Sequence, residues 1–482
     1  MMIMHCSCDS NDHSESGQDY IFFKIYRNKY IRNIIFHHLR LFNKHKQVLE
    51  FKVDELIKYE HREYITSLFI KDNNRNIPKR GIPLSVNELK FGRSFNQPLK
   101  EGVPKSINKI IFGEHFNQPL SLKECDNLEY IEFGDDFNQP LGELPPSLTF
   151  LDLGNESFNQ PLKANTLPKN IIHLKFSASF NHPICSIALS SSSSSSSSPF
   201  INYLPPSLTH LDMGESFNQP IPKNCLPATL KYLRLGFHFN QPLISKKCIP
   251  PNLETLIFGQ LFNQKIKKGY LPSSLLTLEF GSRFNQSIAK GTLPPNLQWL
   301  RFGEGFQGSL ENGSIPSKLV GLTLNINLKK CKKGCLPPSI TSLHLLGCNK
   351  QRLPVGLIPS SVTCLTLGEF YNEELLPNAI PLSVKSLVLG YRFNQPIPPN
   401  AIPSSVQTLS IGECFNQPIG NCLPKSLTTL TLKCKYYFHR FSNENLPTSV
   451  NNLYYTDDKI YDVLNLNDFT ETHSNLKVVK IN

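Results

Sequence analysis

The first candidates for chemistry in this sequence are the thiols of Cys331 and Cys335, whose spacing is typical of one half of a zinc site. A structural zinc site needs a second pair of Cys or His ligands, and no such pair recurs nearby with ligand spacing. The sequence also lacks a Gly-rich phosphate loop, a His-Glu-x-x-His helix and a Gly-x-Ser-x-Gly turn. We therefore expect no metal, no cofactor and no catalytic residue, and interpret the protein as a non-enzymatic binding protein.

Two interleaved sets of side chains could support recognition. One set stands just before a repeated central leucine or isoleucine, and the other stands just after it. Large aromatic residues gather in the first half of the chain beside charged residues, as in the anchors of protein interfaces. The alternative is that ordinary β-sheet preference places the rings there. We predict a partner-binding face made of Tyr130, Phe150, His173, His210, Tyr232, Trp299, Glu132, Asp152, Arg234 and Arg301.

A second pattern is a row of lysines that recurs four residues before a repeated proline. One interpretation is a solvated edge that prevents lateral association. The other is a basic stripe that binds nucleic acid, an acidic phospholipid or another acidic partner. The row consists of Lys223, Lys246, Lys268, Lys290 and Lys333, with Asn312 as an interruption.

Both patterns take their spacing from a repeat that runs through most of the chain. The unit at 82–99 reads Ile-Pro-Leu-Ser-Val-Asn-Glu-Leu-Lys-Phe-Gly-Arg-Ser-Phe-Asn-Gln-Pro-Leu, and its first proline returns about every 22 residues. The exceptional step, from Pro168 to Pro205, is 205 − 168 = 37 residues and contains the serine run 190–198. We predict that residues 186–200 form a flexible insertion that loops out between two units.

The pattern within a unit predicts a short strand followed by a turn. Leu89 and Phe91 are two residues apart, which is the period of a half-buried strand. Gly92 follows at the bend, where a positive φ or a close backbone approach favours glycine. Phe95 then returns to the interior, and the amide of Asn96 suits a ladder that pairs with turn backbone. Because one unit cannot bury its own apolar face, we expect neighbouring units to stack.

The recurring Phe-Asn-Gln-Pro-Leu/Ile motif resembles the FNIP-repeat family, a leucine-rich-repeat-like family of social amoebae, over about 82–455. The resemblance implies a repeat solenoid that is mainly β, a curved leucine-rich-repeat-like stack with one parallel strand per unit of about 22 residues. It implies protein binding and no family chemistry. The units at 316–376 are degenerate, with Asn325, Leu346 and Tyr371 in place of the expected glycines and phenylalanine.

The ends of the chain differ from the repeats. We expect disorder over 1–17, a small helical and basic cap over 18–80 with an introductory rung, the solenoid over 81–455 and a C-terminal cap over 456–482. The apolar residues of 20–42 recur at helical spacing. The segment 18–62 also resembles an F-box-like head, which implies docking to a cullin-type ubiquitin ligase. Binding to a membrane surface or to nucleic acid is a further alternative.

Composition limits the remaining classes. The chain has 482 residues, a formal net charge of +12 and 13 cysteines. No apolar run of about 18 residues exists, so we expect no membrane span. Without a secretory signal in its first residues, the chain is expected to be cytoplasmic, with cysteines that are thiols rather than a disulfide framework. The charge is spread thinly, so it does not by itself favour nucleic acid as the partner.

Overall fold

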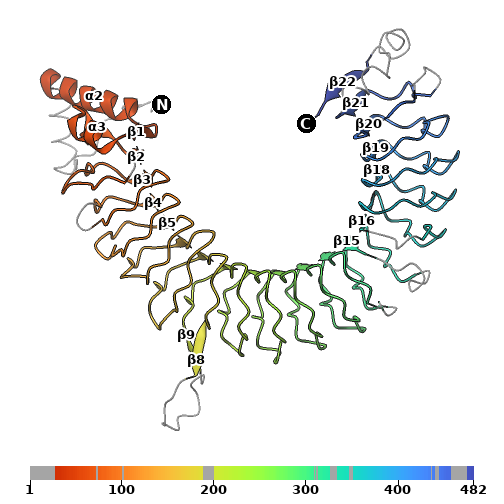
Figure 1. The fold of residues 1–482 in the computed structure, drawn as a ribbon, viewed down its shortest axis with the longest axis horizontal. Coiled ribbons are helices and arrows are strands. Elements are labelled where there is room, and N and C mark those ends of the chain that lie inside the picture. The colour runs from red at the N-terminus through yellow and green to blue at the C-terminus, as the bar shows by residue number, and fades with distance from the viewer. Residues whose placement is uncertain are drawn as a thin grey trace, which may run out of the picture.

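The computed structural model describes residues 28–71, 74–99, 103–187, 200–308, 310, 313–325, 334–346, 351–435, 437–439, 445–456 and 475–481. Over these residues the chain winds into a horseshoe whose inner rim is lined by a parallel β-sheet (Figure 1). The segment 1–17, the serine run 190–198, Cys331 and Lys333 lie outside the described residues. The predicted leucine-rich-repeat-like solenoid with a small N-terminal helical region is confirmed.

The sheet has 20 strands, which pair in chain order, and a separate hairpin of β8 (Cys185–Ile187) and β9 (Phe200–Asn202) stands between β7 and β10. The helices are α2 (Lys29–Lys44), α3 (Val53–Lys58) and the 3₁₀ turn η1 (Arg62–Tyr64). The strands of the sheet are β1 (Leu49–Phe51), β2 (Ser67–Ile70), β3 (Glu88–Phe91), β4 (Lys109–Ile111), β5 (Tyr130–Glu132), β6 (Phe150–Asp152), β7 (His173–Lys175), β10 (His210–Asp212), β11 (Tyr232–Arg234), β12 (Thr255–Ile257), β13 (Thr277–Glu279), β14 (Trp299–Arg301), β15 (Gly321–Leu324), β16 (Ser342–Leu345), β17 (Cys364–Leu367), β18 (Ser386–Val388), β19 (Thr408–Ile411), β20 (Thr429–Leu432), β21 (Asn452–Tyr455) and β22 (Lys477–Lys480).

The core is a set of side-chain rows that run along the solenoid. Leu256 pairs with Leu278 in the next strand, and both side chains are buried. Outward from the sheet, the rings of Phe258 and Phe280 stack with centroids 5.4 Å apart. Farther out, Phe262 and Phe284 stack at 6.0 Å. Since neighbouring strands lie about 4.8 Å apart, the spacing between rungs grows with distance from the sheet and bends the stack into an arc.

The asparagine of the repeated motif forms the predicted ladder. The Oδ1 atom of Asn96 accepts hydrogen bonds from the backbone N–H of Asn117 at 2.9 Å and from Nε2 of Gln118 at 3.0 Å. Equivalent bonds link later units, as far as the Phe438 N–H on Asn416 at 3.3 Å. The side chain therefore acts as an acceptor for turn N–H groups of the next unit.

The repeated glycine is required by close backbone approach. A Cβ atom on Gly113 would come 1.9 Å from the carbonyl oxygen of Gly92 in the preceding unit. Among the described glycines at this position, only Gly154 and Gly214 have a positive φ. The general reason for glycine at this position is therefore the close backbone approach, which leaves no space for a Cβ atom, and not a positive φ.

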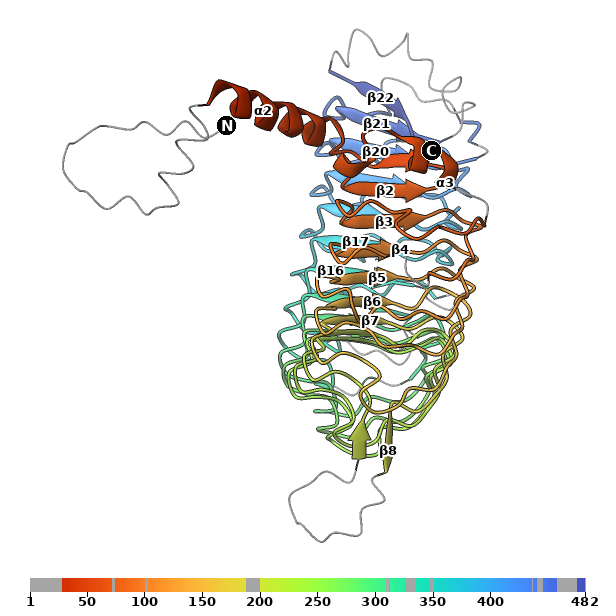
Figure 2. The ribbon, with the colours of Figure 1, turned by 90° about the vertical axis from the view of Figure 1, so that its left-hand side faces the viewer.

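The N-terminal helix α2 lies beside the first rungs and projects from the solenoid (Figure 2). Asn28 caps the helix by accepting from the N–H groups of Tyr30 and Ile31. The helix attaches through its C-terminal end, where buried His45 bonds to the hydroxyl of Tyr59 at 2.7 Å. No residue of α2 is buried. Strand β2 stands where the sequence predicts an introductory rung.

The expectation that the cysteines are thiols is wrong for Cys185 and Cys225 and is confirmed for the six described cysteines that are free, Cys125, Cys248, Cys364, Cys414, Cys422 and Cys434. Cys185 and Cys225 form a disulfide with a Cα–Cα distance of 6.2 Å, although the sequence predicts free thiols. The hairpin at the base of the insertion places Cys185 beside the small slot that Cys225 occupies, and this proximity has no signal in the repeat pattern. Cys335 is also disulfide-bonded. Within the described part of the chain, no His, Cys, Asp and Glu side chains group as a metal site, and no helix could cross a membrane.

Candidate binding surface

The ten residues of the predicted binding face all belong to β5, β6, β7, β10, β11 and β14, strands of the sheet that lines the inner rim. The middle residue of each of these strands is buried, so the residues on either side of it point away from the core. We call one set the aromatic row, which consists of Tyr130, Phe150, His173, His210 and Tyr232. We call the other the charged row, which consists of Glu132, Asp152, Lys175, Asp212 and Arg234.

The aromatic row is a continuous stack of rings across five rungs. The ring centroids of Tyr130 and Phe150 are 4.2 Å apart, and those of Phe150 and His173 are 5.9 Å apart. The two histidine rings lie 4.2 Å apart, and His210 continues to Tyr232 at 5.8 Å. The rings cover one another's faces, so the row presents ring edges to a partner.

Two of the three carboxylates of the charged row pair with cations on neighbouring strands. Lys175 Nζ lies 2.9 Å from Asp152 Oδ2, and Arg234 Nη1 lies 2.9 Å from Asp212 Oδ2. The Tyr130 hydroxyl donates to Glu132 at 2.8 Å and so joins the two rows. These bonds hold the side chains in fixed positions without leaving a strong net field.

Burial between the rows changes several proton affinities. Burial, then the hydrogen bond to Glu132, raises the pKa of the Tyr130 hydroxyl. Burial also raises the pKa of Asp152, against the opposing effect of Lys175. The pKa of His173 is lowered by burial and by neighbouring His210. The aromatic row therefore favours a neutral imidazole at His173.

Trp299 and Arg301 stand apart from the aromatic row, because β12 and β13 carry Thr255 and Thr277 in between. Trp299, which is the only tryptophan of the chain, is 50% exposed although its side chain is large and apolar. Arg301 is exposed on the same strand, and no carboxylate among the described residues forms an ion pair with it. The structure thus places a tryptophan and an arginine side by side near the middle of the arc.

The second half of the inner rim carries small side chains. The residue before the central leucine is small in five consecutive strands from β16 to β20, namely Ser342, Cys364, Ser386, Thr408 and Thr429. From β16 to β20, the position that carries the aromatic row on earlier strands therefore has no large side chain.

The lysine row lies on the edge formed by the turns before the strands. Lys223, Lys246, Lys268 and Lys290 are all exposed there. The stems of the last three lie against a glycine of the following unit, Gly269, Gly291 and Gly313 respectively, each with a positive φ. Sequence reasoning found the lysines but missed these glycines, which recur three residues before the unit proline.

Sequence reasoning also missed two contacts of the binding face. The ammonium group of Lys109 lies 4.7 Å from the ring centroid of Tyr130 and extends the aromatic row by one strand. Gly321 leaves the space that the Trp299 ring occupies. Both residues hold the same repeat position as the aromatic row, and that equivalence is the signal that could have found them.

A curved stack of parallel strands with asparagine ladders defines a leucine-rich-repeat-like solenoid. The family model "FNIP Repeat" matches residues 73–114, 95–125, 116–156, 158–189, 198–238, 239–283, 284–325, 327–370 and 371–414. The protein therefore belongs to the FNIP-repeat family.

Known relatives and one solved structure agree with this assignment. A FNIP repeat-containing protein of Dictyostelium discoideum is 35% identical over 189 residues, which cover 36% of this chain and 33% of the relative. A second from the same organism is 42% identical over 85 residues, 17% of this chain and 23% of the relative. CroV588, described as a novel circular LRR protein, is similar with a TM-score of 0.64 and 31% identity, covering 85% of this chain and 65% of that one. The chain thus spans a third or less of the two amoebal relatives.

Proposed function

We propose that this protein is a non-catalytic scaffold that holds a protein partner against the inner rim of its solenoid. The aromatic row supplies a rigid platform, and the charged row, most of which is paired, supplies hydrogen-bonding groups beside it. Trp299 and Arg301 are the anchors that enter the partner.

The observation that carries the proposal is the exposure of Trp299 beside Arg301. Tryptophan and arginine are the residue types most enriched among the energetically dominant contacts of protein interfaces. Half of this large apolar side chain is accessible to solvent, whereas the central leucine or isoleucine of each rung is buried. A protein surface that covers both side chains would remove this exposed apolar area from water.

The test begins with a photo-crosslinking amino acid at Thr277, between the aromatic row and Trp299. The crosslinked protein is identified, purified and titrated against the Trp299→Ser/Tyr232→Ser variant. We expect at least a tenfold loss of affinity, because the loss of a dominant tryptophan contact alone costs more than about 1.4 kcal/mol. We expect only a small fall in the melting temperature, because Trp299 is half exposed and Tyr232 is a partly buried ring at the end of the stack.

Phe237 offers a matched control, because this ring is 44% exposed and follows the repeated glycine rather than preceding a central leucine. Phe237→Ser should leave the affinity unchanged. Equal crosslinking from Phe237 and Thr277, or unchanged affinity in the double variant, would contradict binding on the inner rim.

We further propose that residues 18–62 act in the cytoplasm as an adaptor head for a cullin-type ubiquitin ligase, which would make the bound partner a substrate. The supporting observation is α2, which exposes Tyr30, Ile34, Ile35 and Leu39 although they are apolar. An apolar helix face of this kind suits a groove on another protein.

The adaptor role is tested by a pull-down with the full chain and with Ile35→Asp/Leu39→Asp. This variant is preferable to deletion of residues 1–80, because that deletion would remove β1 and β2 and uncover the first rungs. Recovery of cullin-type ligase subunits with the unaltered chain and their loss with the variant would support the adaptor. Absence of these subunits from both samples would refute it.

A further inference from the structure

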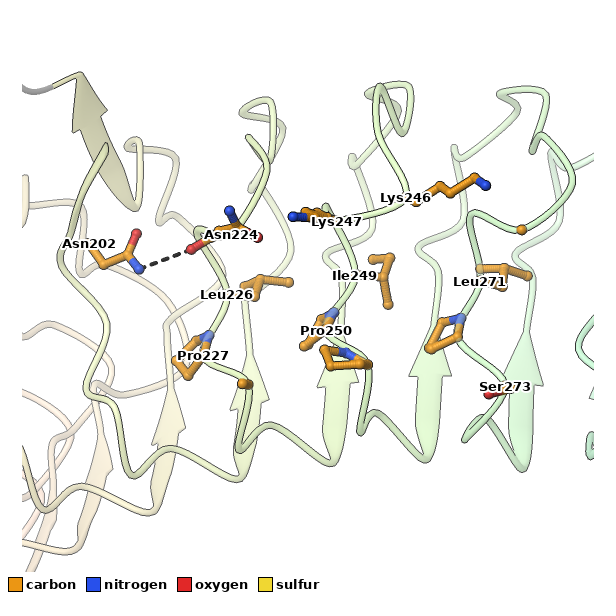
Figure 3. A pocket seen from close by; sticks show the side chains of 14 residues that line it. Asn202, Asn224, Leu226, Pro227, Lys246, Lys247, Ile249, Pro250, Leu271 and Ser273 are labelled. Carbon is orange, nitrogen blue, oxygen red and sulfur yellow. Dashed lines mark hydrogen bonds between the residues drawn. The ribbon is translucent and has the colours of Figure 1, made fainter. Parts of the chain in front are cut away.

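A pocket of about 600 Å³ lies on the lysine edge of the solenoid. It is lined by 14 residues, most of them from the turns that lead into β11, β12 and β13, together with Asn202 at the end of β9 (Figure 3). Asn202 closes one end, where its Nδ2 donates to the carbonyl oxygen of Asn224 at 3.1 Å. None of the lining residues is acidic, aromatic or an arginine.

Two chemically different rows run side by side in this pocket. Leu226, Ile249 and Leu271 form an apolar row with one residue per unit, and Figure 3 shows them on consecutive turns. Lys246 and Lys247 lie farther out in the same view. A ligand that fits both rows needs apolar groups on one side and negative charge on the other.

Further lysines extend the positive charge of the pocket along the edge, with one lysine in each neighbouring unit. Lys223 and Lys268 hold the positions that correspond to Lys246 in the units before and after it. Among the described residues, no carboxylate forms an ion pair with Lys223, Lys246 or Lys268. Their charges are therefore not neutralised within the described chain.

The lysine stems are aligned by the glycines beneath them. A Cβ on Gly269 would lie 3.6 Å from Cε of Lys246, and a Cβ on Gly291 would lie 3.1 Å from Cε of Lys268. Because φ is +77° and +79° at these glycines, the turns disfavour any side chain that would displace the stems. The backbone thus places one ammonium group over each successive turn.

We propose that this pocket is a second binding site, which takes an extended acidic peptide segment of a partner protein. Every second side chain of an extended peptide points the same way, about 6.6–6.8 Å apart. The outer phenylalanine rings of successive units are 6.0–6.1 Å apart in this part of the arc. A segment that alternates acidic and apolar residues can therefore match the lysines and the apolar row over three units.

The lining residues favour a peptide over other anions. Binding of single-stranded nucleic acid relies on aromatic rings that stack on bases, and this pocket has none. A membrane surface is broad and flat, whereas the apolar row lies in a recess whose leucines and isoleucine are buried. The prolines of the wall, Pro227, Pro250 and Pro272, have no N–H to offer, so the lysines provide the recognition of charge.

The test uses a fluorescein-labelled octapeptide of alternating Glu and Leu, and measures anisotropy at low and high salt. We expect saturable binding that weakens with salt, and much weaker binding of octapeptides of alternating Lys and Leu or Glu and Ser. Lys246→Gln/Lys268→Gln should weaken binding about tenfold, because two ammonium groups lose their ion pairs with the peptide. Ala228→Glu, which adds a carboxylate to the lining, should weaken it as well.

The controls separate this site from the inner rim and from general charge. Lys385→Gln/Lys425→Gln removes two exposed lysines that lie outside the pocket, and Trp299→Ser alters the inner rim. Both should bind the octapeptide like the unaltered protein. Equal loss in the Lys385/Lys425 variant, or no saturable binding of the Glu-Leu peptide, would overturn the proposal. Tighter, Lys246-dependent binding of oligo-dT or of phosphatidylserine vesicles would overturn it in favour of those ligands.

Discussion

The indole ring of Trp299 lies over Gly321, its partner in the next strand of the sheet. A Cβ atom on Gly321 would come 2.1 Å from Cε3 of Trp299, so the ring occupies the space that any other residue would fill. Gly321 is buried in consequence, and one face of the indole is covered while the rest faces the inner rim. The glycine therefore sets the orientation of the proposed anchor.

Gly321→Ala should displace the indole without unfolding the protein. Because the chain has one tryptophan, its fluorescence reports this residue alone. We expect the emission to shift to longer wavelength as the ring enters water, and the affinity for an inner-rim partner to fall. An unchanged spectrum in Gly321→Ala, with Gly420→Ala as the control at a site with open space around it, would show that the ring does not depend on the glycine.

Phe258→Ala should be strongly destabilising. The ring is 2% exposed and stacks on Phe262 at 3.9 Å and on Phe280 at 5.4 Å. Removing it leaves a cavity between rungs that tight packing cannot refill, at a cost of about 3–5 kcal/mol. Urea denaturation measures the loss, and Phe237→Ala, at an exposed ring, should cost far less.

Asn240→Leu should cost about 1–3 kcal/mol, because two donors lose their acceptor. The Asn240 Oδ1 atom accepts from the N–H of Asn263 at 2.9 Å and from Nε2 of Gln264 at 3.1 Å. Asn240→Asp keeps an oxygen at this position and should retain most of the stability in urea denaturation. Equal losses in the two variants would mean that side-chain shape, rather than the hydrogen bonds, matters here.

Cys185→Ser should lower the melting temperature only under oxidising conditions. The disulfide closes a sequence separation of 40 residues, for which restriction of the unfolded chain predicts a stabilisation of about 2–4 kcal/mol. Added reductant should lower the melting temperature of the unaltered protein to that of the variant. Free thiols at both positions in protein isolated from the cytoplasm, detected by alkylation and mass spectrometry, would show that the bond does not form there.

His173 should titrate at a lower pH than an ordinary histidine. In the folded chain the pKa of His173 lies below its ordinary 6.5, so the folded state binds fewer protons than the unfolded state as the pH falls through that value. This residue therefore contributes a loss of stability on acidification from about pH 6.5 downward. In His210→Gln, imidazole titration by NMR should show the pKa of His173 moving back up, because one cause of the depression has been removed.

The rungs could be predicted because the same residue types recur at equivalent positions in most units. Leu89, Phe95 and Asn96 have equivalents in most units, so burial, stacking and the asparagine ladder could be inferred from spacing alone. The pairing of Cys185 with Cys225 could not, because Cys185 lies in the hairpin at the base of the insertion, where other units have no equivalent strand. The pocket on the lysine edge also escaped prediction, since its depth depends on how the turns of three units lie against one another.

Because the stack widens outward, the number of units determines how far the horseshoe opens. Each rung adds a similar small angle, because the outer rings are held farther apart than the strands. Gain or loss of whole units by gene duplication would then leave every local contact intact while it moves the two arms together or apart. The number of repeats thus sets the size of the partner that the inner rim can surround. The side chains that recognise this partner can change independently of that number.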